Sequence, residues 1–197
     1  MEIKFIDGGV TAPKGFLASG IHCGIKQGSS SVKKDLALIY SEVPANAAGM
    51  FTKNKVKGAP IYICKEHLAN KKAQAIIINS GNANTCNGDD GLNKAKKMTV
   101  LQAKALNLKA DDVLVASTGV IGVPLNIDAI KDGIPLLTEK LSKNGNEDAA
   151  SAIMTTDTYM KQLAVEFNVG DKKVTIGSMA KGSGMIEPNM GTMLSFL

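Results

Sequence analysis

The glycine-rich segment over residues 181–194, KGSGMIEPNMGTML, contains a threonine that could act as a nucleophile. Thr192 directly follows Gly191, and its hydroxyl could attack the Gly191 carbonyl and break the chain between them. The break would leave Thr192 with a free α-amino group, whose unperturbed pKa of about 7.7 to 8.0 makes it a usable base near pH 7. Thr192 would then supply both nucleophile and base, although in isolation a threonine after a glycine is an ordinary structural residue.

A second turn, Ser117-Thr118-Gly119, follows the apolar run 112–116 and could stabilise an oxyanion. Backbone N–H groups and a hydroxyl at the end of a strand are a common way to build an oxyanion hole. The same residues also suit an ordinary turn between a strand and a helix. Only the combination with Thr192 favours nucleophilic catalysis.

The histidines and cysteines do not form a metal-binding pattern. Cys64 and His67 lie close together, as do His22 and Cys23, but no further pair at ligand spacing completes either set. We therefore expect structural cysteines and a partly exposed histidine. Phosphate-binding and hydrolase motifs are also lacking, since no GxxxxGK[ST] or GxSxG occurs and KGSGMIE breaks GxGxxG at its last position.

Composition excludes several classes of protein. The chain has 197 residues, 44% of them hydrophobic, and a net charge of +5. All 23 basic residues are scattered lysines, which argues against nucleic-acid binding because base and phosphate recognition relies on arginine. Three cysteines without a CxxC motif indicate a reducing compartment rather than a disulfide framework. With no signal peptide and no apolar run near the roughly 20 residues of a membrane span, we expect a cytoplasmic protein without membrane contact.

Hydrophobic patterning predicts a mixed α/β fold without a forced internal domain boundary. Strands are expected over 36–43, 59–65, 73–79 and 112–116, helices over 92–107, 126–142 and 146–156, and a hairpin over 161–169 and 173–179. The asparagine-rich loop 79–91 should be ordered by its own side-chain amides. The chain ends inside an apolar, strand-like run, 193–197, so we expect more polypeptide to follow.

The segment 181–194 strongly resembles the self-cleaving segment of the bifunctional ornithine acetyltransferases and N-acetylglutamate synthases of arginine biosynthesis. Further segments resemble that family in order and spacing: GFLASGIHCGIK (15–26), SEVPANAAGMFTKNKVKGAP (41–60), NSGNANTCNG (79–88), ASTGVIGVPL (116–125) and IMTTDT (153–158). One departure is Gly191, which replaces the usual alanine before the cut and adds backbone freedom there.

The resemblance implies a layered αββα sandwich, with residues 1–191 as an α chain and 192–197 as the first residues of a β chain that is otherwise absent. It implies that Thr192 is the nucleophile and that Thr118 and Gly119 form the oxyanion hole. Thr155, Lys181 and Thr192 would bind the substrate, with Thr156 as a less favoured alternative to Thr155.

The implied reaction is a ping-pong transfer of acetyl from N2-acetylornithine to glutamate through an acetyl-threonine ester, without a cofactor. Some members of the family also use acetyl-CoA, which the sequence leaves open. The implied assembly has two α and two β chains, so the α-chain region alone should be inactive. Two alternatives remain at this point: a related aminopeptidase or amidohydrolase with an N-terminal nucleophile, and a non-catalytic binding protein.

Overall fold

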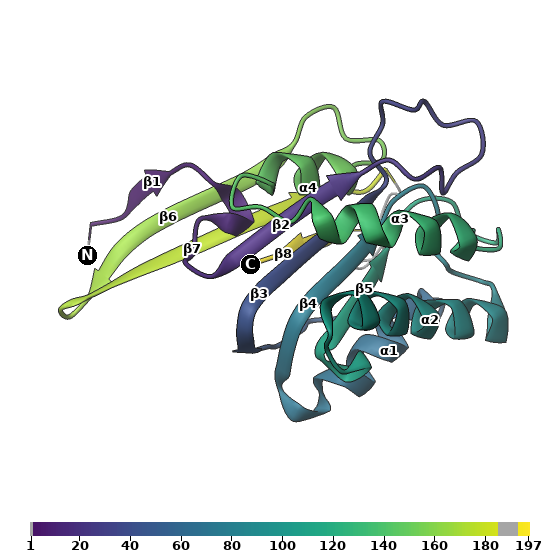
Figure 1. Ribbon diagram of the computed structural model, residues 1–197, viewed down its shortest axis with the longest axis horizontal. Coiled ribbons are helices and arrows are strands. Elements are labelled where there is room, and N and C mark those ends of the chain that lie inside the picture. Colours follow the sequence, from purple (N-terminus) through teal and green to yellow (C-terminus); the bar gives the residue numbers. More distant parts are fainter. Residues whose placement is uncertain (1, 185–192) are drawn as a thin grey trace.

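The computed structural model describes residues 2–184 and 193–197, so Gly191 and Thr192 lie outside the described residues. Two four-stranded sheets form its centre (Figure 1). Sheet A has the order β1-β6-β7-β8, with bounds Lys4–Ile6, Lys161–Val169, Lys172–Lys181 and Leu194–Phe196. Sheet B has the order β2-β3-β4-β5, with bounds Phe16–Ile21, Leu36–Asn46, Lys72–Asn79 and Val113–Ser117.

Sheet B is buried on both faces. Successive residues of a strand point to opposite faces, and β3 accordingly divides its side chains between two cores. Leu36 and Leu38 belong to one core, whereas Ala37 and Ile39 belong to the other. The strands β2, β3 and β4 pair antiparallel, and β5 pairs parallel to β4, as a crossover through a helix requires.

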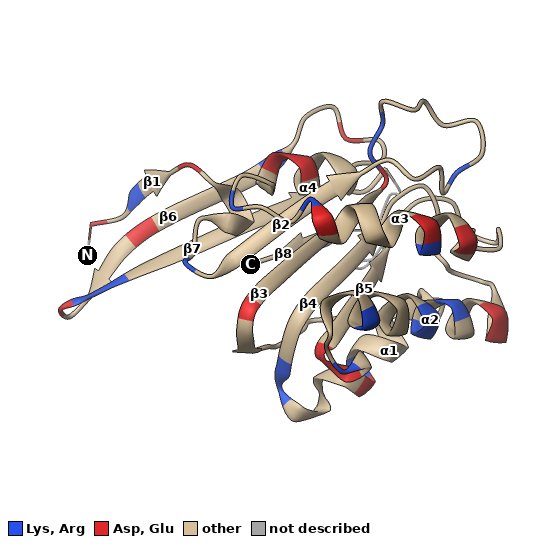
Figure 2. Ribbon diagram, in the orientation of Figure 1, with Lys and Arg blue, Asp and Glu red and all other residues tan. Residues whose placement is uncertain are grey.

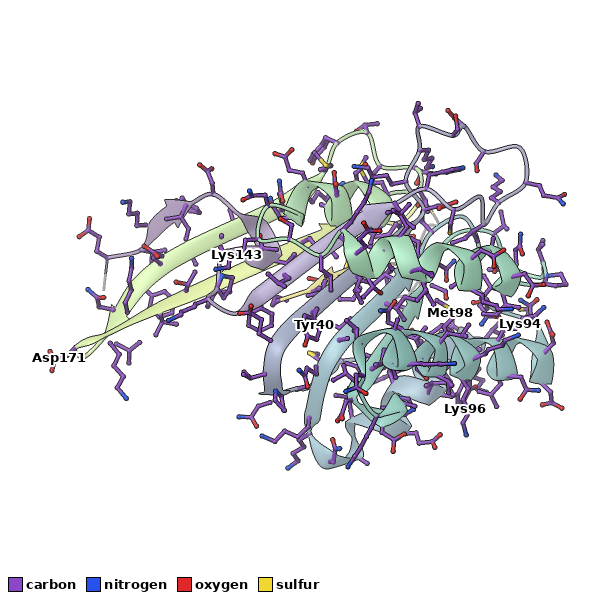
Figure 3. The ribbon with its side chains drawn as sticks, viewed as in Figure 1. Tyr40, Lys94, Lys96, Met98, Lys143 and Asp171 are labelled. Atoms are coloured by element: carbon purple, nitrogen blue, oxygen red, sulfur yellow. The ribbon has the colours of Figure 1, made fainter. Side chains whose placement is uncertain are left out.

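Three helices cover one face of sheet B (Figure 1). They are α1 (Ala59–His67), α2 (Gly88–Leu106) and α3 (Ile127–Glu139). The amphipathic pattern of α2 turns Met98 toward the core and leaves Lys96 exposed, and the two side chains lie on opposite sides of the helix in Figure 3. The first core is therefore the space between these helices and sheet B.

Sheet A packs on the other face of sheet B through a second core. Met179 of β7 and Phe196 of β8 meet Ile39 and Ile78 of sheet B in this core. The short helix α4 (Asn146–Ala152) adds three alanines, and it approaches β2 so closely that a Cβ atom on Gly20 would lie 2.0 Å from the Asp148 carbonyl oxygen. Small residues thus set the distance between α4 and sheet B.

The expected α/β class with two layered sheets is confirmed. The far face of sheet A carries exposed apolar side chains, Leu163 and Ile176 among them, and no helix formed by residues 2–184 or 193–197 covers it. The described layers are therefore helices, sheet B and sheet A.

The expected strand over 59–65 is wrong, because this segment forms α1. Pro60 lies in the first turn of the helix, where a missing N–H group costs no hydrogen bond. The buried residues Ala59, Ile63 and His67 recur every fourth position, which is a helical and not a strand period. The sequence also gave no expectation of β2, whose Ser19 and Gly20 interrupt its apolar pattern.

The other expected elements are present with shifted ends. The helix expected over 92–107 begins earlier, at Gly88, and those over 126–142 and 146–156 end earlier, at Glu139 and Ala152. The hairpin expected after residue 160 is formed by β6 and β7, and the tail pairs with β7 as β8.

Charged side chains are spread over the helices, the loops and the hairpin rather than gathered over one element (Figure 2). No helix within the described part of the chain has the length and apolar character needed to cross a bilayer. Cys23, Cys64 and Cys86 are all free.

The close approach at Gly20 has a measurable consequence. Gly20→Ala would place a methyl group against the backbone of α4, so we expect a loss of about 3 kcal/mol in the free energy of unfolding, the upper range of overpacking. Chemical denaturation of the complete gene product would measure it. The control is Gly170→Ala, in an open hairpin turn at φ +59°, where only backbone strain of about 1–2 kcal/mol is expected. Equal effects of the two variants would contradict this account of the packing.

Candidate active site

The Ser117–Gly119 turn is fixed by the ends of two neighbouring strands. The Thr118 N–H donates to the Asn79 carbonyl at 3.0 Å, and the Ser117 hydroxyl donates to Asn79 Oδ1 at 2.6 Å. The Asn79 amide in turn donates to the Asn82 carbonyl at 2.9 Å. These bonds attach the end of β5 to the loop that follows β4.

Thr118 has a hydroxyl to which none of the described residues bonds. Its side chain is buried, and Oγ1 forms no hydrogen bond with any described residue. The backbone N–H of Thr118 is already used by Asn79, so the hydroxyl is the group that Thr118 can offer to a ligand. A buried hydroxyl left without a hydrogen bond costs free energy, which is typical of groups kept for a function.

Only glycine fits at position 119. Gly119 has φ +135°, and a Cβ atom there would lie 2.3 Å from the Gly81 carbonyl carbon and 2.5 Å from the Asn82 nitrogen. Its backbone can therefore approach the 81–82 segment as no other residue could. The expected oxyanion pair, Thr118 and Gly119, thus lies in one turn. Thr118 contributes a buried hydroxyl there, and the crowded backbone requires glycine at position 119.

The asparagine-rich loop is ordered by its own amides, as the sequence predicts. The Asn82 side chain donates to the Val123 carbonyl at 3.0 Å and accepts from the Asn84 N–H at 2.8 Å. Asn84 donates to the Gly91 carbonyl at 2.8 Å. The loop therefore fixes the segment after Gly119 as well as the turn itself.

Lys181 is a buried cation at the end of β7. Its side chain is 1% exposed, its ammonium group donates to the Gly182 carbonyl, and Nζ lies 4.0 Å from Asp157 Oδ2. Burial lowers the pKa of Lys181, the Asp157 carboxylate opposes that change, and the Lys161 ammonium adds to it. Burial is therefore the larger influence on the pKa of Lys181, and the Asp157 carboxylate opposes it.

Asp157 connects the expected substrate residues, although it was not among the residues expected from the sequence. Its Oδ1 accepts from Lys161 Nζ and from the Gly182 N–H, both at 2.8 Å, and its Oδ2 accepts from the Thr155 N–H at 3.3 Å. Burial alone would raise its pKa, but the hydrogen bonds and the Lys181 charge lower it to about 2. The only sequence signal was an aspartate inside the IMTTDT segment.

The two threonines before Asp157 differ in their surroundings. Thr155 is half-buried, and its carbonyl accepts from Lys33 Nζ at 3.3 Å. Thr156 is exposed and lies against Gly184, where a Cβ atom would be 3.0 Å from its hydroxyl. Of the two, Thr155 is therefore the threonine whose backbone N–H bonds to Asp157, the carboxylate that also faces Lys181.

The strand pattern brings the two halves of the site to one end of the second core. Ala116 of β5 and Met179 of β7 pack in that core, and the alternation of strand side chains places Thr118 and Lys181 two residues further along on the same inward-facing sides. Strands β4 and β7 run toward the same end of the sandwich in Figure 1. Leu194, the first residue of β8, pairs with Lys181, so β8 begins beside the buried cation.

The cysteine and histidine pairs have structural contacts. Cys64 Sγ donates to the Val115 carbonyl at 3.0 Å, and His67 Nδ1 lies 2.8 Å from the Val113 carbonyl oxygen, so both tie α1 to β5. Burial raises the pKa of Cys64 to about 11. His22 Nδ1 lies 2.7 Å from the Lys33 carbonyl oxygen, and the Cys23 N–H donates to Asp35 at 2.7 Å.

Curated relatives match nearly the whole chain. The Arginine biosynthesis bifunctional protein ArgJ of Caldanaerobacter subterraneus subsp. tengcongensis is 53% identical over 195 residues, 99% of this chain and 47% of that protein. The protein of the same name from Symbiobacterium thermophilum is 50% identical over 195 residues, 99% of this chain and 48% of that protein. The chain thus spans about half the length of these relatives.

Solved structures agree in fold. A crystal structure of Arginine biosynthesis bifunctional protein ArgJ from Bacillus halodurans has TM-score 0.87 and 42% identity, covering 95% of this chain and 97% of the solved one. Ornithine acetyltransferase from Mycobacterium tuberculosis, complexed with ornithine, has TM-score 0.84 and 38% identity, covering 95% and 98%. The ArgJ family model matches residues 17–197. The chain therefore belongs to the ArgJ family.

Proposed function

We propose that the complete gene product is an acyltransferase of arginine biosynthesis that moves acetyl from N2-acetylornithine to glutamate. The observation that carries the proposal is the pairing of Leu194 with the buried Lys181, because β8 begins two residues after Thr192 in the sequence and lies beside a cation suited to a substrate carboxylate. The names of the relatives and the ornithine bound to the Mycobacterium tuberculosis enzyme support this assignment.

The chemistry begins with a cut between Gly191 and Thr192. The Thr192 hydroxyl attacks the Gly191 carbonyl, so the acyl group moves from the Thr192 nitrogen to its oxygen and the amine is freed. Water then hydrolyses this ester, which gives the Gly191 carboxylate and restores the Thr192 hydroxyl. The freed amine takes the proton of the Thr192 hydroxyl as the oxygen attacks the acetyl carbonyl of N2-acetylornithine. Ornithine leaves as the free amine and acetyl remains on Thr192 as an ester. The amine of glutamate then attacks the ester, which gives N-acetylglutamate and restores Thr192.

Thr118 and Gly119 serve the two tetrahedral intermediates of this exchange. Each intermediate carries a negative oxygen, and the Thr118 hydroxyl, with the backbone of Gly119, donates to it. Lys181 and Thr155 hold the substrate, Lys181 through its charge. One amide is exchanged for another, so the scheme consumes no cofactor; acetyl-CoA is a second donor to be assayed beside N2-acetylornithine.

The proposal includes a second chain that begins at Thr192. The curated relatives are about twice as long as the stretch they share with this chain, whereas the two solved chains are covered to 97% and 98%. This difference supports a family in which the polypeptide is divided near this point. We propose that the two products stay together, as two copies of each, in the cytoplasm.

Intact mass spectrometry of the complete gene product tests the nucleophile. We expect two fragments whose masses place the break between Gly191 and Thr192, and one uncut chain for Thr192→Ala, because the attacking hydroxyl is gone. An uncut wild-type chain would overturn the processing step. Acetyl transfer to glutamate without hydrolysis of aminoacyl anilides would separate the proposed activity from that of an aminopeptidase.

The Thr118 hydroxyl offers a second test. Thr118→Val should lower the rate of acetyl transfer about a hundredfold, as the loss of one oxyanion donor does, without lowering thermal stability. The matched control is Thr11→Val, because the buried Thr11 hydroxyl donates to the Gly8 carbonyl at 2.8 Å. That variant should lose about 1 kcal/mol of stability and keep its activity. Full activity of Thr118→Val would contradict the oxyanion role.

A further inference from the structure

A buried charge requires compensation, and the Asp157 carboxylate contributes to that of Lys181. The Lys181 and Asp157 side chains are 1% and 2% exposed, so the charges of both groups are largely removed from water. Removing one partner of such a pair leaves the other charge uncompensated and is costly. The separation of 4.0 Å gives attraction without a short hydrogen bond between the two.

The same carboxylate holds three separate segments of the chain. It accepts from the N–H of Thr155 in the turn after α4, from Lys161 at the start of β6 and from the Gly182 N–H after β7. Hydrogen bonds from these three segments therefore fix the positions of both carboxylate oxygens. Because Thr155 and Lys181 depend on one carboxylate, their relative positions are set by it.

The Asp157 carboxylate is shared between two cations. One carboxylate faces two ammonium groups, those of Lys161 and Lys181. Lys161 makes the shorter contact, 2.8 Å to Oδ1, and its side chain is 35% exposed. Lys181 is held by the same carboxylate at longer range, with Nζ 4.0 Å from Oδ2, so Asp157 orients both ammonium groups.

We propose that Asp157 is a positioning residue, whose carboxylate holds the Lys181 ammonium and the Thr155 backbone in the arrangement that receives the carboxylate of the amino-acid substrate. The inference rests on the proposed function and adds to it a residue that does not itself touch the substrate. Asp157 acts through Lys181, and its removal should therefore affect substrate binding more than the chemistry at Thr192.

The test measures kcat and KM for N2-acetylornithine as a function of pH in the complete gene product. Asp157→Asn should raise KM at least about tenfold, the effect of losing one charge-assisted contact, with kcat changed much less. Asp157 raises the pKa of Lys181, so without it that pKa falls and the alkaline limb of kcat/KM should move to lower pH.

Lys161→Met is the matched control of opposite sign. Lys161 lowers the pKa of Lys181, so its removal should move the alkaline limb to higher pH. The Lys161 side chain is partly exposed, so Lys161→Met should fold. This variant keeps the test decisive if Asp157→Asn fails to fold. A purely structural role for Asp157 would not produce shifts of opposite sign, and an unmoved or downward-shifted limb in Lys161→Met would overturn the proposal.

Lys181→Met separates the two levels of the proposal. If Lys181→Met raises KM and Asp157→Asn does not, the positioning role is wrong while the proposed function stands. If Lys181→Met leaves KM unchanged, the substrate contact is wrong and the positioning role is overturned with it. Absence of acetyl transfer in the wild type would overturn the proposed function itself.

Discussion

Sheet B is buried on both faces, and each of its strands must therefore supply apolar side chains to two cores. In β3 the adjacent residues Leu38 and Ile39 point into different cores. Helices fill one side and sheet A fills the other, so the strand ends are the places where polar groups can gather. The Thr118 turn and the Asn79 bonds lie at such an end, directly after β5 and at the last residue of β4. The candidate site therefore lies where the strands of sheet B are no longer buried on both faces.

Local patterns in the sequence were sufficient for much of this architecture. The apolar run 73–79 is β4, and the alternation of apolar and lysine residues after Leu92 belongs to α2. The segment 59–65 is wrongly predicted as a strand because APIYICK is apolar without a visible period. Only the burial of every fourth residue reveals the helix. β2 was missed because Gly20 is dictated by the approach of α4, which is distant in sequence.

The candidate site likewise contains residues that the sequence identifies and contacts that it does not. Thr118, Gly119 and Lys181 were accessible from motifs, because each stands in a segment similar to the family. The contact between Asp157 and Gly182 was not accessible, since it joins two segments that fold together only through sheet A. Nor could the sequence say which group of Thr118 is available. The use of its N–H by Asn79 decides that, and it depends on the pairing of β4 with β5.

The pairing of β7 with β8 places a geometric bound on a terminus created at position 192. Leu194, Ser195 and Phe196 are held in register against Lys181, Ala180 and Met179. A chain of two residues reaches about 7 Å at most, so Thr192 would remain within about that radius of the Leu194 anchor even after the bond before it is broken. A group held on so short a tether has an effective concentration of about millimolar or above. The three residue pairs between β7 and β8 would therefore keep the new terminus near Lys181 after the proposed cut.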